Sequence, residues 1–179
     1  RRAEFLRMKG DTEAAGRLYG RVVVEFKSGP FRLRAAYRRA RLYMDAGDYE
    51  SAAAHFNVIG RENPPADLAA AALYYLGESL HETGAIDKAD AAFARVLKEH
   101  PGSMFYAYAL MQRGDIHRDK WTAAADTGAG DADKYAELAL GFFKQVLERP
   151  GTDRTAAEAL FQMAEIYFRR QDFERSSER

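Results

Sequence analysis

One stretch of the sequence is restated 37 residues further along the chain. Residues 47–64 read GDYESAAAHFNVIGRENP, and residues 84–101 read GAIDKADAAFARVLKEHP. The same shift aligns glycines, small residues and large apolar residues in most of the chain. Self-similarity at a period of about 20–50 residues is typical of folds that stack copies of one unit, because a single copy cannot bury its own apolar face. The repeat therefore predicts an array of similar units.

Each copy of the repeat has the pattern of two α-helices. Apolar residues recur at three- and four-residue spacing within each half, as at Leu76 and Leu80. A glycine separates the two halves, and a proline follows the second half at Pro64, Pro101 and Pro150. Glycine is favoured just after a helix, and proline cannot continue one. No stretch shows the sustained alternation with β-branched residues that predicts strands, so we expect an all-α chain.

The period divides the 179 residues into about five antiparallel helix hairpins. One step of the repeat is 50 residues instead of 37, a difference of 13 extra residues. We place this insertion at residues 119–134, between the two helices of the fourth hairpin. The sequence starts and stops within the pattern, so we expect it to be part of a longer protein. The predicted units of this single repeat domain are residues 1–30, 31–66, 67–103, 104–152 and a truncated 153–179.

The insertion contains the only tryptophan of the chain, Trp121, and then a run of Gly, Ala and Asp. Loop-closure entropy grows slowly with length, so a loop between two helices can be lengthened without disturbing their stacking. We expect a surface loop, either simply mobile or in contact with a partner through Trp121. Asp126, Asp131 and Asp133 do not predict a calcium-binding loop, because the ordered alternate ligands and the closing glutamate are missing.

The repeated positions carry a characteristic set of residues. The third unit holds Leu73, Leu76, Gly77, Leu80, Ala89, Phe93 and Pro101, and the second holds Ala36, Arg39, Ala40, Tyr43, Ala52, Phe56 and Pro64. This pattern resembles the tetratricopeptide repeat (TPR), whose period is usually about 34 residues. The resemblance implies a right-handed superhelical solenoid that acts as a scaffold for protein–protein interaction. The longer period, with stretches such as FARVLKEHPGS, is similar to bacterial envelope members, including β-barrel-assembly lipoproteins and Tol-Pal coordinators.

In solenoids of this family the first helix of each unit lines a concave surface, so the resemblance implies a binding groove there. Aromatic residues ringed by polar groups favour capture of a peptide or partner protein. The alternative is that these side chains only fill the space between adjacent helices. The expected lining is Tyr37, Arg41, Met44, Tyr74, Glu78, His81, Met111, Asp115, Arg118, Phe161, Glu165 and Phe168, with Glu4 and Arg7 in the first unit. We expect no clamp for a C-terminal carboxylate, because these positions lack the Lys and Asn residues that chaperone-type members use.

A basic cluster lies within residues 32–41, and it consists of Arg32, Arg34, Arg38, Arg39 and Arg41. Residues 1–41 hold 12 Lys/Arg and 4 Asp/Glu, a balance of +8, whereas the remainder holds 15 and 23, a balance of −8. On a helix Arg34, Arg38 and Arg41 share one face. The cluster is either a solvated helix face, a contact for an acidic partner, or a site for an anionic polymer. Nucleic acid is not favoured, because phosphate binding requires a broader basic surface.

The sequence contains none of the motifs that indicate catalysis or metal binding. It has no cysteine, and its four histidines lack metal-ligand spacing, His117 being at a packing position of the repeat. Phosphate-binding loops and nucleophile elbows are absent. We therefore expect no enzyme, no cofactor and no metal. The longest apolar run, residues 68–77, is shorter than the roughly 20 residues of a transmembrane helix, and the bacterial periplasm or envelope and the cytoplasm both remain open.

The sequence thus predicts a scaffold that binds a protein or peptide, acidic in one reading, through its concave surface. One alternative is a structural spacer or self-association module within a larger protein. The other is binding of an anionic polymer by the basic cluster.

Overall fold

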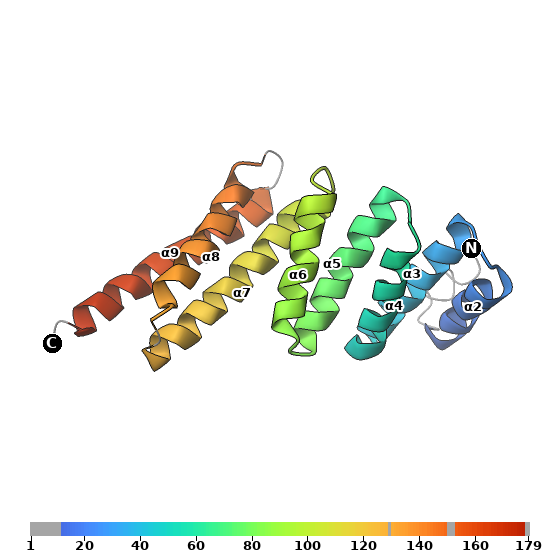
Figure 1. Ribbon diagram of the computed structural model, residues 1–179, viewed down its shortest axis with the longest axis horizontal. Coiled ribbons are helices and arrows are strands. Elements are labelled where there is room, and N and C mark those ends of the chain that lie inside the picture. Colours follow the sequence, from blue (N-terminus) through green and yellow to red (C-terminus); the bar gives the residue numbers. More distant parts are fainter. Residues whose placement is uncertain (1–11, 129, 150–152, 178–179) are drawn as a thin grey trace. The chain divides into compact units, whose positions relative to one another are not determined.

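The computed structural model describes residues 12–128, 130–149 and 153–177, and every regular element in these ranges is an α-helix (Figure 1). The prediction of an all-α chain of TPR-like hairpins with one enlarged unit is confirmed. Glu4, Arg7 and Pro150 lie outside the described residues. The helices are α2 (Thr12–Glu25), α3 (Pro30–Asp45), α4 (Tyr49–Arg61), α5 (Ala66–Glu82), α6 (Ile86–Glu99), α7 (Phe105–Thr127), α8 (Ala132–Leu147) and α9 (Asp153–Ser177).

The chain forms two compact units, Arg1–Ser103 and Met104–Arg179. The division falls at the boundary predicted between the third and fourth hairpins. In the first unit, α2 packs on α3, α3 on α4, α4 on α5 and α5 on α6, and α3 also contacts α5. In the second unit, α8 packs on both α7 and α9, and α7 contacts α9. Each unit thus repeats the arrangement in which a second helix lies against its own first helix and, where one follows, the next first helix.

Two described turns of the first unit, α3–α4 and α5–α6, share the same glycine geometry and backbone hydrogen bond. Gly47 and Gly84 have positive φ angles of 76° and 75°, which glycine adopts without steric cost. The amide of Gly47 donates to the Met44 carbonyl at 2.9 Å, and that of Gly84 donates to the His81 carbonyl at 2.9 Å. Asp48 then caps α4 by accepting a hydrogen bond from the Ser51 amide at 3.0 Å. The turn glycines Gly47 and Gly84, predicted from the repeat, therefore end the first helices α3 and α5.

In the hairpins α5–α6 and α7–α8, a phenylalanine of the second helix packs on a glycine of the first. A Cβ atom added to Gly77 would lie 2.6 Å from the Phe93 ring, and one added to Gly114 would meet the Phe143 ring in the same way. Both phenylalanines are 0% exposed. In the preceding hairpin Ala40 takes the place of the glycine and shares a buried cluster with Phe56. The predicted core positions are confirmed, and the small residues allow the two helices to approach closely.

The expected loop at residues 119–134 is wrong. Helix α7 continues to Thr127, so it has 23 residues where α5 has 17, and only a short turn precedes α8. Trp121 is 3% exposed on this helix and is therefore not part of a partner-contact loop. The reason is visible in retrospect: His117, Trp121 and Ala124 continue the buried face at helical spacing, and no helix breaker occurs before Gly128, whose φ of 69° ends the helix.

Candidate functional site

The predicted lining residues of the first unit form a connected cluster between α3 and α5. The Arg41 guanidinium lies 4.0 Å from the centroid of the Tyr75 ring, and its positive charge acts on the Tyr37 hydroxyl. The Tyr37 and Tyr75 rings meet edge to face, with centroids 6.0 Å apart. The Tyr74 hydroxyl donates to Glu78 Oε1 at 2.7 Å. Cation–π and hydrogen-bond contacts thus bind these side chains to one another.

Burial in this cluster raises the pKa of Glu78 above its ordinary value, although the hydrogen bond from Tyr74 and the positive charge of Arg41 oppose the shift. Burial likewise raises the pKa of the Tyr37 hydroxyl. Removing a carboxylate from water disfavours its charged form. Burial of the charged form of Glu78 therefore lowers the stability of the folded state relative to burial of the protonated form.

Replacing Glu78 with glutamine is expected to raise the free energy of unfolding at pH 7, because the amide keeps an acceptor for the Tyr74 hydroxyl without a buried charge. The raised pKa means that the folded state binds the proton more tightly than the unfolded state. The wild-type protein is then stabilised as pH falls through that pKa. The advantage of the variant should shrink as pH falls towards and below the ordinary value of 4.5. Urea denaturation at several pH values measures this difference, and a gain independent of pH would contradict burial of charge as its cause.

The remaining predicted positions differ in their access to solvent. Tyr74 is 7% and Met111 5% exposed, so these two side chains fill space between helices. Met44 and His81 are half-buried, and Met44 packs against the core of the first unit. Phe161 and Phe168, by contrast, are 62% and 65% exposed. The accessible aromatic side chains of the predicted set are therefore on α9.

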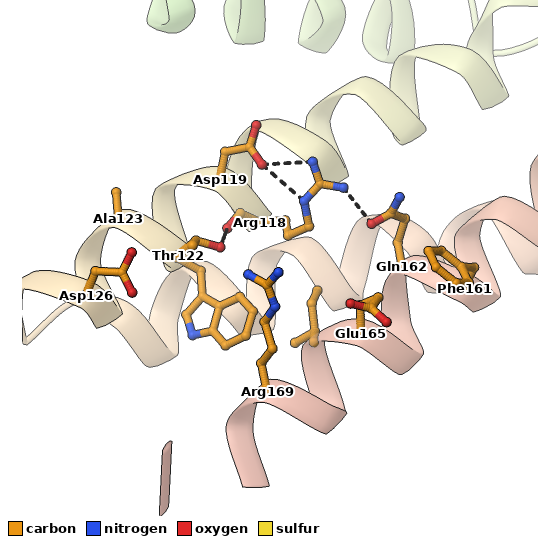
Figure 2. Close-up of a pocket in the computed structure, with 11 residues that line it drawn as sticks. Arg118, Asp119, Thr122, Ala123, Asp126, Phe161, Gln162, Glu165 and Arg169 are labelled. Atoms are coloured by element: carbon orange, nitrogen blue, oxygen red, sulfur yellow. Dashed lines mark hydrogen bonds and ion pairs between the residues drawn. The ribbon is translucent and has the colours of Figure 1, made fainter. Parts of the chain in front are cut away.

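A cavity of about 550 Å³ lies between α7 and α9 in the second unit (Figure 2). It brings together four of the predicted residues, namely Arg118, Trp121, Phe161 and Glu165, whereas Phe168 does not line it. Sequence reasoning missed Asp119, Thr122, Ala123, Asp126, Gln162, Ile166 and Arg169. Thr122 and Asp126 follow Arg118 at four-residue steps, a signal that becomes readable once α7 is known to continue through the insertion.

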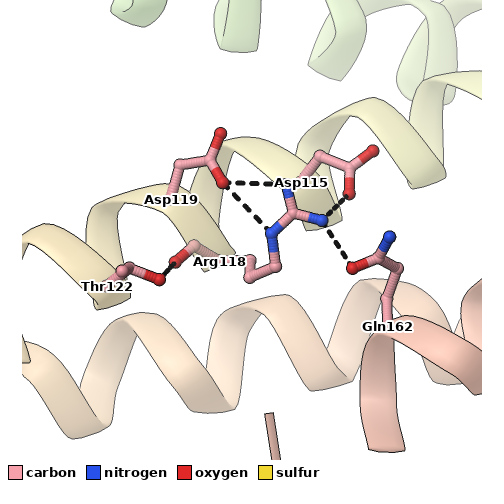
Figure 3. A network of polar contacts seen from close by, with 5 residues as sticks. All are labelled: Asp115, Arg118, Asp119, Thr122 and Gln162. Atoms are coloured by element: carbon pink, nitrogen blue, oxygen red, sulfur yellow. Dashed lines mark hydrogen bonds and ion pairs between the residues drawn. The ribbon is translucent and has the colours of Figure 1, made fainter. Parts of the chain in front are cut away.

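Arg118 is the centre of the polar network beside this cavity (Figure 3). Its guanidinium donates to Asp115 Oδ1 at 2.8 Å, to Asp119 Oδ1 at 2.8 and 3.1 Å, and to Gln162 Oε1 at 2.5 Å. The bond to Gln162 connects α7 to α9. Two carboxylates thus already neutralise Arg118, so it serves to hold the two helices in position.

Three charged residues of the cavity have no polar partner within the described part of the chain: Asp126, Glu165 and Arg169. Figure 2 shows the Arg169 side chain extending from α9 towards α7. With Asp119 and Arg118 included, the lining contains three carboxylates and two guanidinium groups. The cavity therefore combines apolar walls from Trp121 and Ile166 with charges that a ligand can contact.

The basic cluster on α3 is divided among different partners. Arg32 forms an ion pair with Glu62 at the end of α4. Arg39 lies over the Tyr43 ring at 5.7 Å and donates to its hydroxyl at 3.2 Å. Arg41 is held against Tyr75. The expected open face of Arg34, Arg38 and Arg41 is thus incomplete, since only Arg34 and Arg38 are exposed.

No group of three or more potential metal ligands comes together among the described residues. Within the same ranges, no helix is long and apolar enough to cross a membrane. His117 is 8% exposed and stacks on the Phe142 ring, with centroids 5.5 Å apart. Its predicted packing role is confirmed.

Comparison with known proteins supports the repeat architecture. The chain is similar to MamA, with 18% sequence identity and a TM-score of 0.57 over 95% of this chain and 96% of that one. It is also similar to a Podosopora anserina chain of nearly identical TPR-like repeats, described as a kinesin light chain, and to a variant of it in which one glutamine is replaced by methionine. These two have 18% identity and TM-scores of 0.59 and 0.60, over 98% of this chain and 88% of theirs. At this identity the likeness shows the fold alone.

None of the curated proteins is significantly similar in sequence to the chain. The family model described as tetratricopeptide repeat matches residues 2–67 and again residues 37–104. These matches overlap and together span residues 2–104, more than half of the 179 residues. The chain belongs to the tetratricopeptide repeat family.

Proposed function

We propose that the chain is a protein-interaction scaffold that holds a short segment of its partner in the cavity between α7 and α9. Repeats of this family generally mediate protein–protein interaction and form non-catalytic scaffolds. The observation that carries the proposal is the cavity itself. It joins the exposed Phe161 and the buried Trp121 to charges that have no polar partner among the residues that the structure describes. A concave, partly apolar site with a few polar groups is the usual form of a binding site.

The size and charge of the cavity limit the segment that it can hold. Its volume of about 550 Å³ falls within the range of roughly 300–1,000 Å³ typical of ligand sites, which is room for one or two side chains. An apolar or aromatic side chain of the partner fits against Phe161 and Trp121. Asp126 and Glu165 favour a neighbouring positive charge. The segment that we propose is therefore apolar and neutral to basic, because among the described residues the two unpartnered carboxylates outnumber the one unpartnered guanidinium, that of Arg169. The expected acidic partner has less support, since Arg118 and Arg41 are already engaged.

The test is selection of binders from a phage library of random short peptides on the immobilised protein. Replacing Phe161 with alanine is expected to lower the affinity of the selected peptides by about tenfold or more, as for a residue at the centre of an interface. Replacing Asp126 with alanine should lower the affinity of the selected peptides that carry a basic residue. Phe168→Ala is the matched control, because Phe168 is an equally exposed phenylalanine of α9 outside the cavity.

The outcomes separate this proposal from its alternatives. Peptides that bind Phe161→Ala and wild-type protein equally would contradict the cavity as the site. Failure to select any peptide would favour the structural spacer. Binding of heparin that is lost when Arg34 and Arg38 are both replaced with glutamine would favour the anionic-polymer reading. The likeness to bacterial envelope members stays a prediction.

A further inference from the structure

The first unit also contains a cavity, which lies between α2 and α3 and has a volume of about 840 Å³. Its lining on α2 extends from Thr12 to Glu25, which corresponds to about 20 Å because an α-helix rises about 1.5 Å per residue. Sites for small molecules typically have volumes of roughly 300–1,000 Å³. The cavity is therefore an elongated groove with room for a small molecule, and the proposed function does not use it.

Two glycines of α2 widen this α2–α3 groove. Gly16 and Gly20 are one turn apart and both line it, whereas α4 has Ala53 and Asn57 at the equivalent positions of the repeat. On the opposite wall, Leu42 Cδ1 lies 3.6 Å from a Cβ atom built on Gly16. Because the glycines have no side chain, the space beside Leu42 is open to a ligand.

The equivalent positions between α4 and α5 are closed. A shift of 37 residues takes Arg39 to Leu76 and Leu42 to Ser79, which are 9% and 0% exposed on α5. Arg39 and Leu42 themselves are only half-buried on α3. Both walls are present in each case, since α2 packs on α3 and α4 packs on α5. The opening of the α2–α3 groove therefore results from side chains that differ between copies of the repeat.

The charges of the groove are not fully compensated. Its lining contains three arginines and two glutamates, and four of these residues form ion pairs along α2. Arg17 pairs with Glu13, and Arg21 pairs with Glu25 at a distance of 2.9 Å between Nε and Oε1. Arg39 on α3 has no carboxylate partner among the described residues. The groove thus contains one positive charge that no described carboxylate neutralises.

The Arg39 side chain is held at the wall of the groove. Its guanidinium lies over the Tyr43 ring and donates from Nη2 to the Tyr43 hydroxyl at 3.2 Å. Its Cζ and Nη1 atoms lie 3.6 Å from a Cβ atom built on Gly20. A guanidinium has five N–H donors, and the described residues supply no other acceptor for them. A positioned guanidinium with unused donors suits a carboxylate, which it can bind with two parallel hydrogen bonds.

We propose that the α2–α3 groove binds a small carboxylate with a linear apolar body, of the class of the medium-chain fatty acids. The carboxylate accepts hydrogen bonds from Arg39, and the apolar body lies along Gly16 and Leu42. Charge complementarity selects an anion, because Arg39 is the one charged group of the lining that no described residue of opposite charge contacts. The length of the groove and its glycine floor suit an unbranched chain. The proposal does not depend on the cavity between α7 and α9.

The test is isothermal titration calorimetry of the intact protein at neutral pH with dodecanoate, kept below its micelle concentration. Dodecyltrimethylammonium is the matched probe, because it has the same alkyl chain with the opposite charge. The protein is expected to bind dodecanoate about tenfold or more tightly than the cation, since hydrogen bonds to charged groups are the stronger ones.

Arg39→Gln is expected to lower the affinity for dodecanoate by about tenfold or more and to remove the preference for the anion. The matched control is Arg38→Gln, which removes an exposed guanidinium of the same helix outside the groove. This control should leave the affinity for dodecanoate within about twofold of that of the wild-type protein, because only the groove arginine contacts the ligand.

Gly16→Leu fills the groove and is expected to lower the affinity for dodecanoate by about tenfold without removing Arg39. Leucine has a higher helix propensity than glycine, so α2 should keep its structure, and circular dichroism verifies this. Asp126→Ala in the cavity between α7 and α9 should leave the affinity for dodecanoate unchanged. Failure of this proposal and failure of the proposed function are therefore distinguishable.

Four results would overturn the proposal. The first is the absence of dodecanoate binding below the micelle concentration. The second is equal affinity of the wild-type protein for dodecanoate and for dodecyltrimethylammonium. The third is equal affinity of Arg39→Gln and the wild-type protein for dodecanoate. The fourth is binding of hexaglutamate that is as tight as that of dodecanoate, since an acidic peptide without an apolar body would then be sufficient.

Discussion

Replacing Phe143 with alanine is expected to lower the free energy of unfolding by about 3–5 kcal/mol, the range for a large aromatic side chain removed from a core. Phe143 is 0% exposed, and its ring fills the space left by Gly114 on α7. The glycine has no side chain that could move into the vacated volume, so the cavity cannot close by a change of rotamer. We therefore expect the loss in the free energy of unfolding to lie near the upper end of that range.

Phe168→Ala is the matched control for this loss. It removes the same atoms from α9 at a position that is 65% exposed, and surface substitutions are usually within about 0.5 kcal/mol of neutral. Urea denaturation followed by the fluorescence of Trp121 measures both variants, because Trp121 is the only tryptophan and lies buried in the second unit. Equal stability of the two variants would contradict the role of Phe143 as the contact that holds α8 on α7.

The repeat arithmetic predicted the hairpin contacts because residues aligned by the period perform the same packing task. A phenylalanine of the following helix lies on Gly77 and on Gly114, and the equivalent Phe56 shares a buried cluster with Ala40. Their regular spacing in the sequence therefore predicts which residues contact each other in the structure. The same repeat register predicted Phe161 and Glu165 on α9 as lining residues of a binding groove, and both line the cavity between α7 and α9.

The arithmetic failed where the repeat is interrupted. An insertion has no aligned copy, so its length alone does not distinguish a loop from a longer helix. The run of alanines after Trp121 has high helix propensity, and this outweighed the expectation of a loop. Asp126 was missed for that reason, because its place beside the cavity exists only if α7 continues beyond the insertion point.

Burial of individual lining residues could not be predicted from a single helix. Tyr74 and Phe161 occupy equivalent positions in the repeat, yet they are 7% and 62% exposed. The difference comes from the side chains that neighbouring helices bring to each position, and these contacts are not encoded in the period. The same holds for Arg41, whose engagement with Tyr75 depends on the approach of α5 to α3.

Replacing Gly114 with valine is expected to destabilise the protein by about 3 kcal/mol, at the upper end of the usual range for an overpacked core. A Cβ atom at this position would collide with the Phe143 ring, and valine adds two methyl groups beyond it. Because the ring is fully buried, it can yield only if α8 moves away from α7. The measurement is the urea midpoint by far-UV circular dichroism.

The matched control for this substitution is Gly141→Ala on α8. Nothing lies within 4 Å of a Cβ atom built on Gly141, so alanine there should stabilise the helix by up to about 1 kcal/mol through its higher propensity. The two glycines are thus expected to respond with opposite signs. If Gly114→Val were as stable as the wild-type protein, the helices would not be held at the separation that glycine permits. Partial recovery on adding Phe143→Leu to Gly114→Val would instead locate the clash at the ring, because a smaller side chain there makes room for the valine.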